Sequence, residues 1–516
     1  MYIRLEKPNY RFGDDMMNSI ERKIIADGVA FNNIKVNRFK TIRMSINLYV
    51  PLNVEDAAHN ALLRGLLTRS CKAYPDFTQF SKKLSALYGT DIVSSVKKTG
   101  AYQVLTFTAV GIDDRYVFTD EIISAEISKL LCEVIFNPNI TDGKFNDNDF
   151  EQERRQLLDA IDAEFNDKRG YAISTMLSNM LKNETCGIKR YGSVEEIKKI
   201  TPESLVDAWK KLLKDSVVEI FYIGDSGADK AEKVFTDAYS KIDRTPCKVD
   251  MSYVKSADEV QRVVEEMDVS QSKLVLGFRS GVGCTDTEKE WIAGRLMCAV
   301  LGGTANSKLF NNVREKQSLC YYCAASYNFI NGLMIVDSGV LNENIEKTEK
   351  AILKEVEDMK NGNITDFEIE ATKRAIVNGF RTSNDTTAGI DNWYSSQFIN
   401  EGFNSIEELA AKYNAVTKEE IVEAAKKLTL DTVYVLKNKY VWYLALANIF
   451  VYLIRQGVVN WIPIYLKESK GFSAANANWA MFLFEYAAIP ASILLGWLSD
   501  VVFKGKRAPL SILCMI

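Results

Sequence analysis

Apolar and polar positions follow two different periods along residues 1–436. Short segments rich in β-branched and aromatic residues predict strands, and longer segments with helical spacing predict helices. The helices are predicted over Asn148–Leu181 and Asp366–Thr382, and the strands over Ile42–Val50, Tyr102–Val110, Val217–Ile223, Lys273–Phe278, Leu319–Tyr327 and Met334–Gly339. Strands separated by long helices predict an α+β fold with antiparallel sheets, each covered by helices on one face.

One helix–strand pattern occurs twice. Thr201 opens a helical segment whose strand follows Asp215, and Thr417 opens a similar segment whose strand follows Asp431. Both pairs have the same offset of 216 residues (417 − 201 and 431 − 215). Each threonine is suited to cap a helix, and Glu420 completes a capping box in the second copy. The repeat predicts a duplication, with homologous α+β domains at 1–245 and 246–436 and a linker over Arg244–Asp258.

The composition changes abruptly after Leu436, so residues 437–516 form a third region. Residues 440–466 are apolar over a length of ~40 Å as a helix, enough to cross a bilayer. A second apolar stretch runs from Gly471 to Ser499. Tryptophans near the predicted ends, with basic residues beyond them, predict a transmembrane hairpin that contacts the membrane through residues 440–499. Two buried helices of a third soluble domain are the alternative.

Composition narrows the functional classes further. The net charge of −4 gives no reason to expect a nucleic-acid partner. Nine cysteines, an odd number, argue against a disulfide framework and favour a reducing compartment. We interpret the one close pair, Cys320 and Cys323, as two small residues of a strand, with a redox or metal pair as the alternative.

The first residues show no basic stretch followed by an apolar run, so the sequence predicts no signal peptide. We therefore expect residues 1–436 to be cytoplasmic, and tethered to the inner membrane if the C-terminal hairpin inserts.

Several stretches spread in order over both copies carry a family resemblance. They include Tyr74-Pro, Leu87-Tyr-Gly, Phe150-Glu-Gln-Glu-Arg-Arg, Leu301-Gly-Gly, Leu309-Phe and Val313-Arg-Glu-Lys-Gln-Ser-Leu-Cys-Tyr. With them, the first 436 residues resemble the pitrilysin/insulinase metallopeptidases, most closely the bacterial subunits that lack zinc. The resemblance implies two homologous α+β domains in one subunit.

Active members of that family carry an inverted zinc motif, H-x-x-E-H, and a glutamate ligand on a later helix. Two imidazoles and a carboxylate leave one zinc position open for water, and the motif glutamate takes the proton of that water. This chain holds a single histidine, His59, so it cannot supply two imidazoles. We expect no metal, no cofactor and no peptidase activity from the chain alone, and a surface or half-buried position for His59.

The resemblance also fixes which residues replace the zinc motif. Aligned through Arg69-Ser-Cys71, Ala61, Arg64 and Gly65 stand at the positions of the two histidines and the glutamate. On the later helix, Glu153 matches a supporting glutamate of the family, and the ligand position falls at Ala160.

The family's second domain carries an arginine and a tyrosine that reach substrate near the zinc. Arg314 and Tyr321 match this pair. A guanidinium offers forked donors to a peptide carbonyl or carboxylate, and a phenol adds another donor. The resemblance thus implies substrate contact, and from the residues alone a helix-end arginine and a core-facing tyrosine are the alternative.

The tail resembles a different family. Its segments Asn448–Gly457, Trp461–Glu468 and Gly496–Arg507 resemble organophosphate/phosphate antiporters of the major facilitator superfamily, of the glycerol-3-phosphate transporter type. By this resemblance Arg455 is a phosphate-binding residue, and an arginine within an apolar span is usually functional. Two helices are too few to transport, so we expect either a truncated fusion or a membrane anchor.

These observations favour a non-catalytic pitrilysin-like subunit that binds peptide and pairs with a homologous zinc-bearing subunit. The alternatives are a membrane protein whose working part is the transporter-like tail, and a scaffold protein that binds no peptide.

Overall fold

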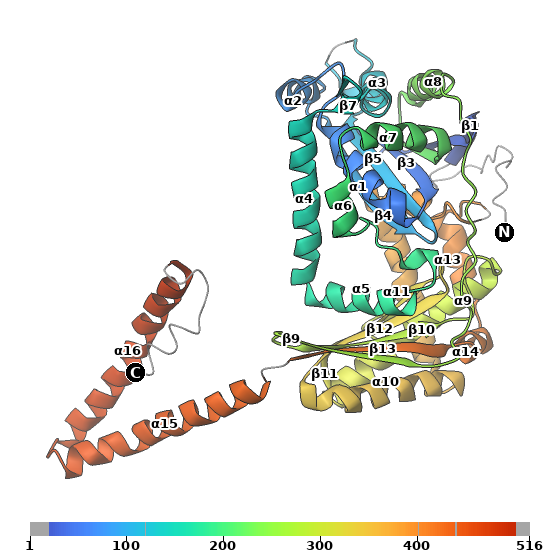
Figure 1. The fold of residues 1–516 in the computed structure, drawn as a ribbon. Coiled ribbons are helices and arrows are strands. Elements are labelled where there is room, and N and C mark those ends of the chain that lie inside the picture. Colours follow the sequence, from blue (N-terminus) through green and yellow to red (C-terminus); the bar gives the residue numbers. More distant parts are fainter. Residues whose placement is uncertain (1–19, 119, 401, 439–440, 502–516) are drawn as a thin grey trace. The chain divides into compact units, whose positions relative to one another are not determined.

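A computed structural model describes residues 20–118, 120–400, 402–438 and 441–501, and the N-terminal residues used to predict the absence of a signal peptide lie outside these ranges. The chain divides into two compact units, residues 1–437 and the tail at 438–516. Each unit is described by itself below, and Figure 1 gives the labels of their elements.

The first sheet is mixed and six-stranded, in the order β1-β2-β8-β3-β5-β4. Its strands are β1 (Ile20–Ala26), β2 (Val29–Lys35), β3 (Thr41–Pro51), β4 (Asp91–Thr99), β5 (Tyr102–Ile112) and β8 (Val217–Gly224). The predicted antiparallel arrangement is wrong for β2 and β8, which run parallel. The long helical connection between these two strands allows this, since parallel neighbours need a crossover that a short turn cannot provide.

The second sheet repeats the first with one strand fewer. Its order is β11-β12-β10-β13-β9. Taken from its other edge, that order matches β2-β8-β3-β5-β4 strand for strand. The strands are β9 (Gln261–Met267), β10 (Ser272–Arg279), β11 (Cys320–Asn328), β12 (Leu333–Val340) and β13 (Thr429–Asn438). A separate two-stranded ribbon joins β6 (Ile140–Thr141) and β7 (Lys144–Phe145).

Helices cover each sheet and enclose its main hydrophobic core. Those between residues 54 and 239 are α1 (Val54–Arg69), α2 (Phe77–Ala86), α3 (Ile123–Phe136), α4 (Asp147–Asn166), α5 (Lys168–Met180), α6 (Val194–Lys199), α7 (Ser204–Asp215) and α8 (Ala228–Tyr239). Those that follow are α9 (Glu288–Cys298), α10 (Ile345–Lys360), α11 (Asp366–Thr382), α12 (Thr387–Ser395), α13 (Ile406–Ala415) and α14 (Lys418–Lys426). The helix α9 continues into a π-helical segment, Ala299–Gly303, and a second π-helical segment spans Leu309–Lys316.

Each half of this unit packs one helix on the sheet of the other half. The helix α5 packs on the second sheet, where Met176 and Met180 join a core with Val275 and Tyr434. Its Arg169 donates to Asp337 of β12 at 2.6 and 3.1 Å. Gly277 permits this approach, because a Cβ there would lie 2.7 Å from the sulfur atoms of both methionines.

The reciprocal helix is α12, which packs on the first sheet. Ile390 and Tyr394 contribute to a core with Phe221 and Ile223 of β8. Asp391 accepts hydrogen bonds from Arg43 Nε at 2.7 Å and from Ser45 Oγ at 2.6 Å. Helices therefore lie on both faces of each sheet, which corrects the one-face prediction, and the boundaries 1–245 and 246–436 stay a prediction.

The other sequence predictions of elements can be compared directly. The predicted strands lie within one or two residues of β3, β5, β8, β10, β11 and β12, and Asp366–Thr382 is α11. The prediction of one helix over Asn148–Leu181 is wrong, because the chain turns at Asp167, whose side chain caps α5. Thr417 and Glu420 form the predicted capping box.

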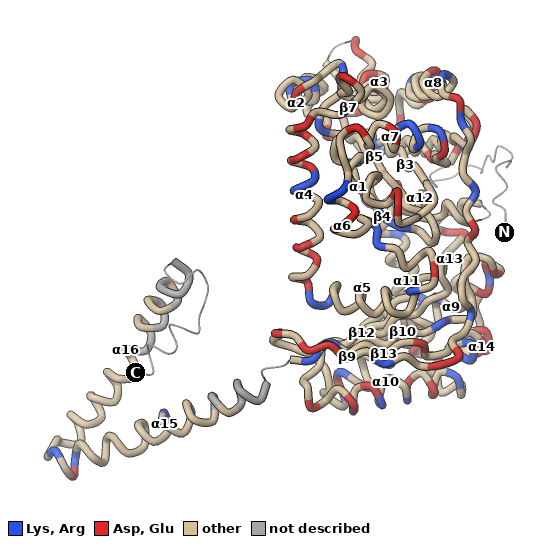
Figure 2. The backbone as a smooth tube through the Cα atoms, viewed as in Figure 1, with Lys and Arg blue, Asp and Glu red and all other residues tan. Residues whose placement is uncertain are grey.

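The tail consists of α15 (Val441–Glu468) and α16 (Ala474–Val501), which contact each other. Figure 2 shows that charged residues are sparse along the drawn parts of both helices and gather near the turn between them. Among the described residues, one segment, Ile449–Glu468, is long and apolar enough to cross a membrane. The predicted pair of transmembrane helices is thus supported at one helix and not at the second.

Candidate functional site

The positions of the missing zinc motif lie on α1, which packs against α4. Asn53 begins α1 by accepting a hydrogen bond from the backbone N–H of Asp56 at 2.7 Å. Ala61 is buried in the main core of the first sheet. Arg64 is half-buried, and its guanidinium donates to the Ser94 carbonyl of β4 at 3.2 Å. Neither residue offers a side chain that could bind a metal ion.

Gly65 is the most constrained of these positions. A Cβ built there would lie 2.8 Å from the Glu153 carboxyl carbon and still closer to Oε2 of the same group. The Glu153 side chain of α4 therefore occupies the space that a larger residue at position 65 would need. A larger residue at position 65 would therefore have to displace the Glu153 carboxylate from its place beside Arg69.

A partly buried network of ion pairs holds Glu153 in this place. Arg69 Nη1 lies 3.2 Å from Glu153, and Arg69 Nε donates to Asp149 at 2.7 Å. Asp149 also accepts from Ser70 Oγ at 3.3 Å. Arg69, Asp149 and Glu153, which we call the Arg69 cluster, bring one cation to two carboxylates. The guanidinium thus neutralises acidic groups on the helix pair where active relatives would place a metal ion.

The remaining predicted positions do not assemble into a metal site. Ala160 is exposed on α4, and His59 is half-buried, with Nδ1 3.0 Å from the Glu55 carbonyl oxygen. Over the residues that the structure describes, no group of three or more histidine, cysteine, aspartate or glutamate side chains could hold a metal ion. Burial raises the pKa of the nearby Cys71 thiol, so this cysteine is not an activated nucleophile.

The predicted peptide-binding residues do come together on the second sheet. Arg314 lies in the π-helical segment Leu309–Lys316, which ends just before β11. Its Nε donates to the Tyr321 carbonyl oxygen at 2.9 Å, and its guanidinium lies 4.6 Å from the centre of the Phe310 ring. The Arg314 side chain is 38% exposed and Tyr321 is 60% exposed. The tyrosine is not a core residue, so the packing alternative fails for it.

Part of the Arg314 guanidinium remains available for a ligand. One of its terminal nitrogens pairs with Glu315 at 3.2 Å, a neighbouring carboxylate that is itself 54% exposed. A pair this exposed contributes little stability and can be displaced by a ligand carboxylate. The Tyr321 ring extends from an edge strand of the second sheet, since β11 has a single neighbour, β12. The arrangement suits a peptide that meets donors at the strand edge.

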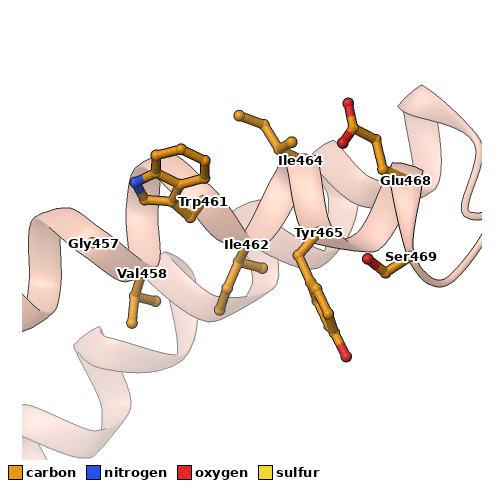
Figure 3. Close-up of a pocket in the computed structure, with 8 residues that line it drawn as sticks. All are labelled: Gly457, Val458, Trp461, Ile462, Ile464, Tyr465, Glu468 and Ser469. Atoms are coloured by element: carbon orange, nitrogen blue, oxygen red, sulfur yellow. The ribbon is translucent and has the colours of Figure 1, made fainter.

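The tail residues are arranged along one helix. Figure 3 shows a surface depression lined by eight residues of α15 and the turn that follows it, among them Trp461, Tyr465 and Glu468. Arg455 lies one turn earlier on α15, on an exposed part of the helix. Its phosphate-binding role stays a prediction.

Comparison with known proteins gives one set of relatives for the part before the tail and another for the tail. Residues 199–376 match the family model of the peptidase M16 inactive domain. Probable inactive metalloprotease YmfF of Bacillus subtilis is 28% identical over 411 residues, which cover 80% of this chain and 96% of that protein. A conserved protein from Enterococcus faecalis V583 has the same fold, with a TM-score of 0.75 and 28% identity over 81% of this chain and 99% of that structure.

The tail has its own relatives. The glycerol-3-phosphate transporter of Bacillus subtilis is 54% identical over 93 residues, which make up 17% of this chain. The match spans 21% of the length of that transporter. The resemblances inferred from the sequence are thereby confirmed for both parts. The chain joins a peptidase M16-like part, which matches the M16 inactive domain over residues 199–376 and is similar to a relative named as inactive, to a segment similar to a fraction of a phosphate-ester transporter.

Proposed function

We propose that residues 1–436 act as a non-catalytic M16-like subunit that binds peptides through Arg314 and Tyr321. The observation that carries the proposal is their joint exposure next to the edge strand β11, with Arg314 held by the Tyr321 carbonyl. The positions of the zinc motif support the other half of the proposal, because Ala61, Arg64 and Gly65 offer no metal ligand and the Glu153 side chain fills the space beside Gly65.

Peptide binding can be tested with the full chain in mild detergent. The probe is a dye-labelled tryptic digest of casein, and the readout is fluorescence anisotropy. We expect Arg314→Ala to weaken binding at least ~10-fold, the loss of about one strong charge-assisted hydrogen bond. Arg381→Ala is the matched control, since Arg381 is an exposed arginine paired with Glu407 on helices away from β11. Equal binding by the wild type and Arg314→Ala would overturn the peptide site and favour the scaffold alternative.

We further propose that the partner is a homologous subunit that carries H-x-x-E-H. A subunit with exposed peptide donors and no metal site needs a zinc centre supplied by another chain to cut what it binds. The test is co-purification with such a homologue from the same genome, followed by a peptidase assay. Cleavage should require both chains and should fall with Arg314→Ala. Zinc bound one-to-one by this chain alone, or cleavage by it alone, would defeat the proposal.

A second proposal concerns the tail, and the apolar segment Ile449–Glu468 supports it. We propose that α15 associates the chain with a membrane. Fractionation of cells that express the full chain should place it in the membrane pellet, where alkaline carbonate does not release it. Deletion of residues 439–516 should move the protein to the supernatant, and an unchanged distribution would count against the membrane role.

A further inference from the structure

Two cysteines flank the proposed peptide-binding tyrosine at the start of β11. Cys323 is buried within the core of the second sheet, and Cys320 is half-buried and packs against that core. Tyr321, between them, is exposed. If Cys320 and Cys323 are only two small residues of a strand, their packing is explained. Their position relative to each other is not.

A β-bulge sets that position. Cys320 pairs with Val340 and Tyr322 pairs with Gly339, so two steps on β11 face one step on β12. In a regular strand, residues three apart point to opposite faces of the sheet. The extra residue at Tyr321 shifts this alternation and turns Cys320 toward the face of Cys323. Both side chains then pack at the same core of the second sheet.

The surroundings also favour a thiolate at Cys320. The hydrogen bond from Cys323 lowers the pKa of Cys320 to about 7, and Ser338 and the positive charge of Arg314 add to this effect against the opposing effect of burial. In contrast, burial raises the pKa of Cys284 to about 11 and those of Cys132 and Cys298 to about 12. A partly exposed thiolate beside a second thiol has the features of a redox-sensitive cysteine with a resolving partner.

We propose that Cys320 and Cys323 form a redox-active dithiol that a hydroperoxide converts to an intramolecular disulfide. The Cys320 thiolate attacks the peroxide, the O–O bond breaks, and Cys320 becomes a sulfenic acid while hydroxide or alkoxide leaves. The Cys323 thiol then attacks the Cys320 sulfur, the S–S bond forms, the S–O bond breaks, and water leaves. Two thiols are oxidised by two electrons in total, the peroxide is reduced by two, and a dithiol reductant reverses the change.

Closure of this disulfide also regulates peptide binding, a consequence that rests on the proposed function. Arg314 Nε donates to the carbonyl of Tyr321, the residue enclosed by the two cysteines. A disulfide across residues 320–323 would redirect this carbonyl and the Tyr321 ring. We expect the oxidised chain to bind peptide several-fold more weakly than the reduced chain.

The chemistry can be tested by mass spectrometry on the full chain. The protein is treated with hydrogen peroxide at neutral pH, blocked with iodoacetamide and digested with trypsin, which yields one peptide, residues 317–347, that contains both cysteines. We expect this peptide to lose its two thiol hydrogens and to recover them with dithiothreitol. Before oxidation, Cys320 should alkylate ~10-fold or more faster than Cys284, whose thiol is half-buried.

Isosteric variants separate the outcomes. Cys320→Ser should abolish the disulfide and leave Cys323 reduced, whereas Cys284→Ser should leave disulfide formation unchanged. A peptide that remains fully alkylated after oxidation, or that ends as a sulfinic acid at Cys320, would overturn the dithiol. If the disulfide forms and peptide binding is unchanged, the regulatory consequence fails alone. If neither redox state binds peptide, the proposed function fails while the dithiol stands.

Discussion

The two copies of the duplicated unit have diverged in opposite directions at the places that matter for peptide chemistry. Beside the first sheet, at the positions of the missing zinc motif, the Glu153 side chain fills the space next to Gly65, and Arg69 pairs with its carboxylate. On the second sheet, Arg314 and Tyr321 stay exposed beside an edge strand. The difference teaches that the two copies present opposite chemistry, since the first encloses a carboxylate paired with an arginine and the second exposes hydrogen-bond donors.

The largest effect on stability is expected at Gly65 in the first copy. Gly65→His would restore one histidine of the zinc motif, and we expect it to destabilise the fold by about 3 kcal/mol, because the new side chain meets Glu153. Pulse proteolysis of the full chain across a urea series measures this change. The double variant with Glu153→Ala should be less destabilised than the sum of the single variants.

Gly379→Ala supplies the matched control for this substitution. Gly379 lies within α11, and a Cβ there would meet nothing within 4 Å. The control should be neutral or stabilising by up to about 1 kcal/mol, since alanine is the better helix former. A Gly65→His variant as stable as the wild type would show that the Glu153 side chain yields to a larger residue at position 65.

The second prediction concerns Arg69, the cation that pairs with Asp149 and Glu153. Arg69→Met should cost about 2 kcal/mol, because it leaves Asp149 and Glu153, one helical turn apart on α4, without their shared partner. The same urea series measures the loss. Arg381→Met, which breaks an exposed pair with Glu407, should cost no more than about 1 kcal/mol. Equal costs for the two variants would mean that the Arg69 cluster is an ordinary surface network.

The sequence predicted the duplication well, because the repeated pattern from Thr201 and Thr417 reports local structure directly. It did not predict the exchange of α5 and α12, since the pattern of Met176 or Tyr394 shows that a face is buried and not which sheet buries it. The parallel pairing of β2 with β8 was missed for a different reason, because β2 was not identified as a strand.

The candidate site could be predicted in part. The single histidine shows that the sequence lacks H-x-x-E-H, and a family resemblance points to Arg314 and Tyr321 as candidates, whose exposure the structure adds. The Arg69 cluster was missed, although Asp149 and Glu153 lie four residues apart and so share a face of α4. Its basic member comes from another helix, and a sequence does not show which distant residue will pair with such a face. The bulge at Tyr321 was also invisible, because it depends on the register with β12.

The third prediction separates stability from binding on the second copy. Arg314→Ala should change the free energy of unfolding by about 1 kcal/mol or less, because the side chain is 38% exposed and makes one hydrogen bond to Tyr321. Peptide binding should fall at least ~10-fold in the same preparation. A large loss of stability would instead make Arg314 a structural residue, equivalent in kind to Arg69, and the contrast between the copies would disappear.

The smallest effect is expected for Tyr321→Phe, which isolates one hydroxyl group. The Tyr321 backbone carbonyl that positions Arg314 is untouched, and the ring is 60% exposed, so the free energy of unfolding should stay within about 0.5 kcal/mol. If the phenol donates to the peptide, binding should weaken about 5-fold, the equivalent of one hydrogen bond of about 1 kcal/mol. Anisotropy titrations against the wild type and Arg314→Ala would place the variant between the two. Binding unchanged from the wild type would mean that Tyr321 contributes to the site through its backbone carbonyl alone. Of the two exposed donors, only the Arg314 guanidinium would then contact the peptide.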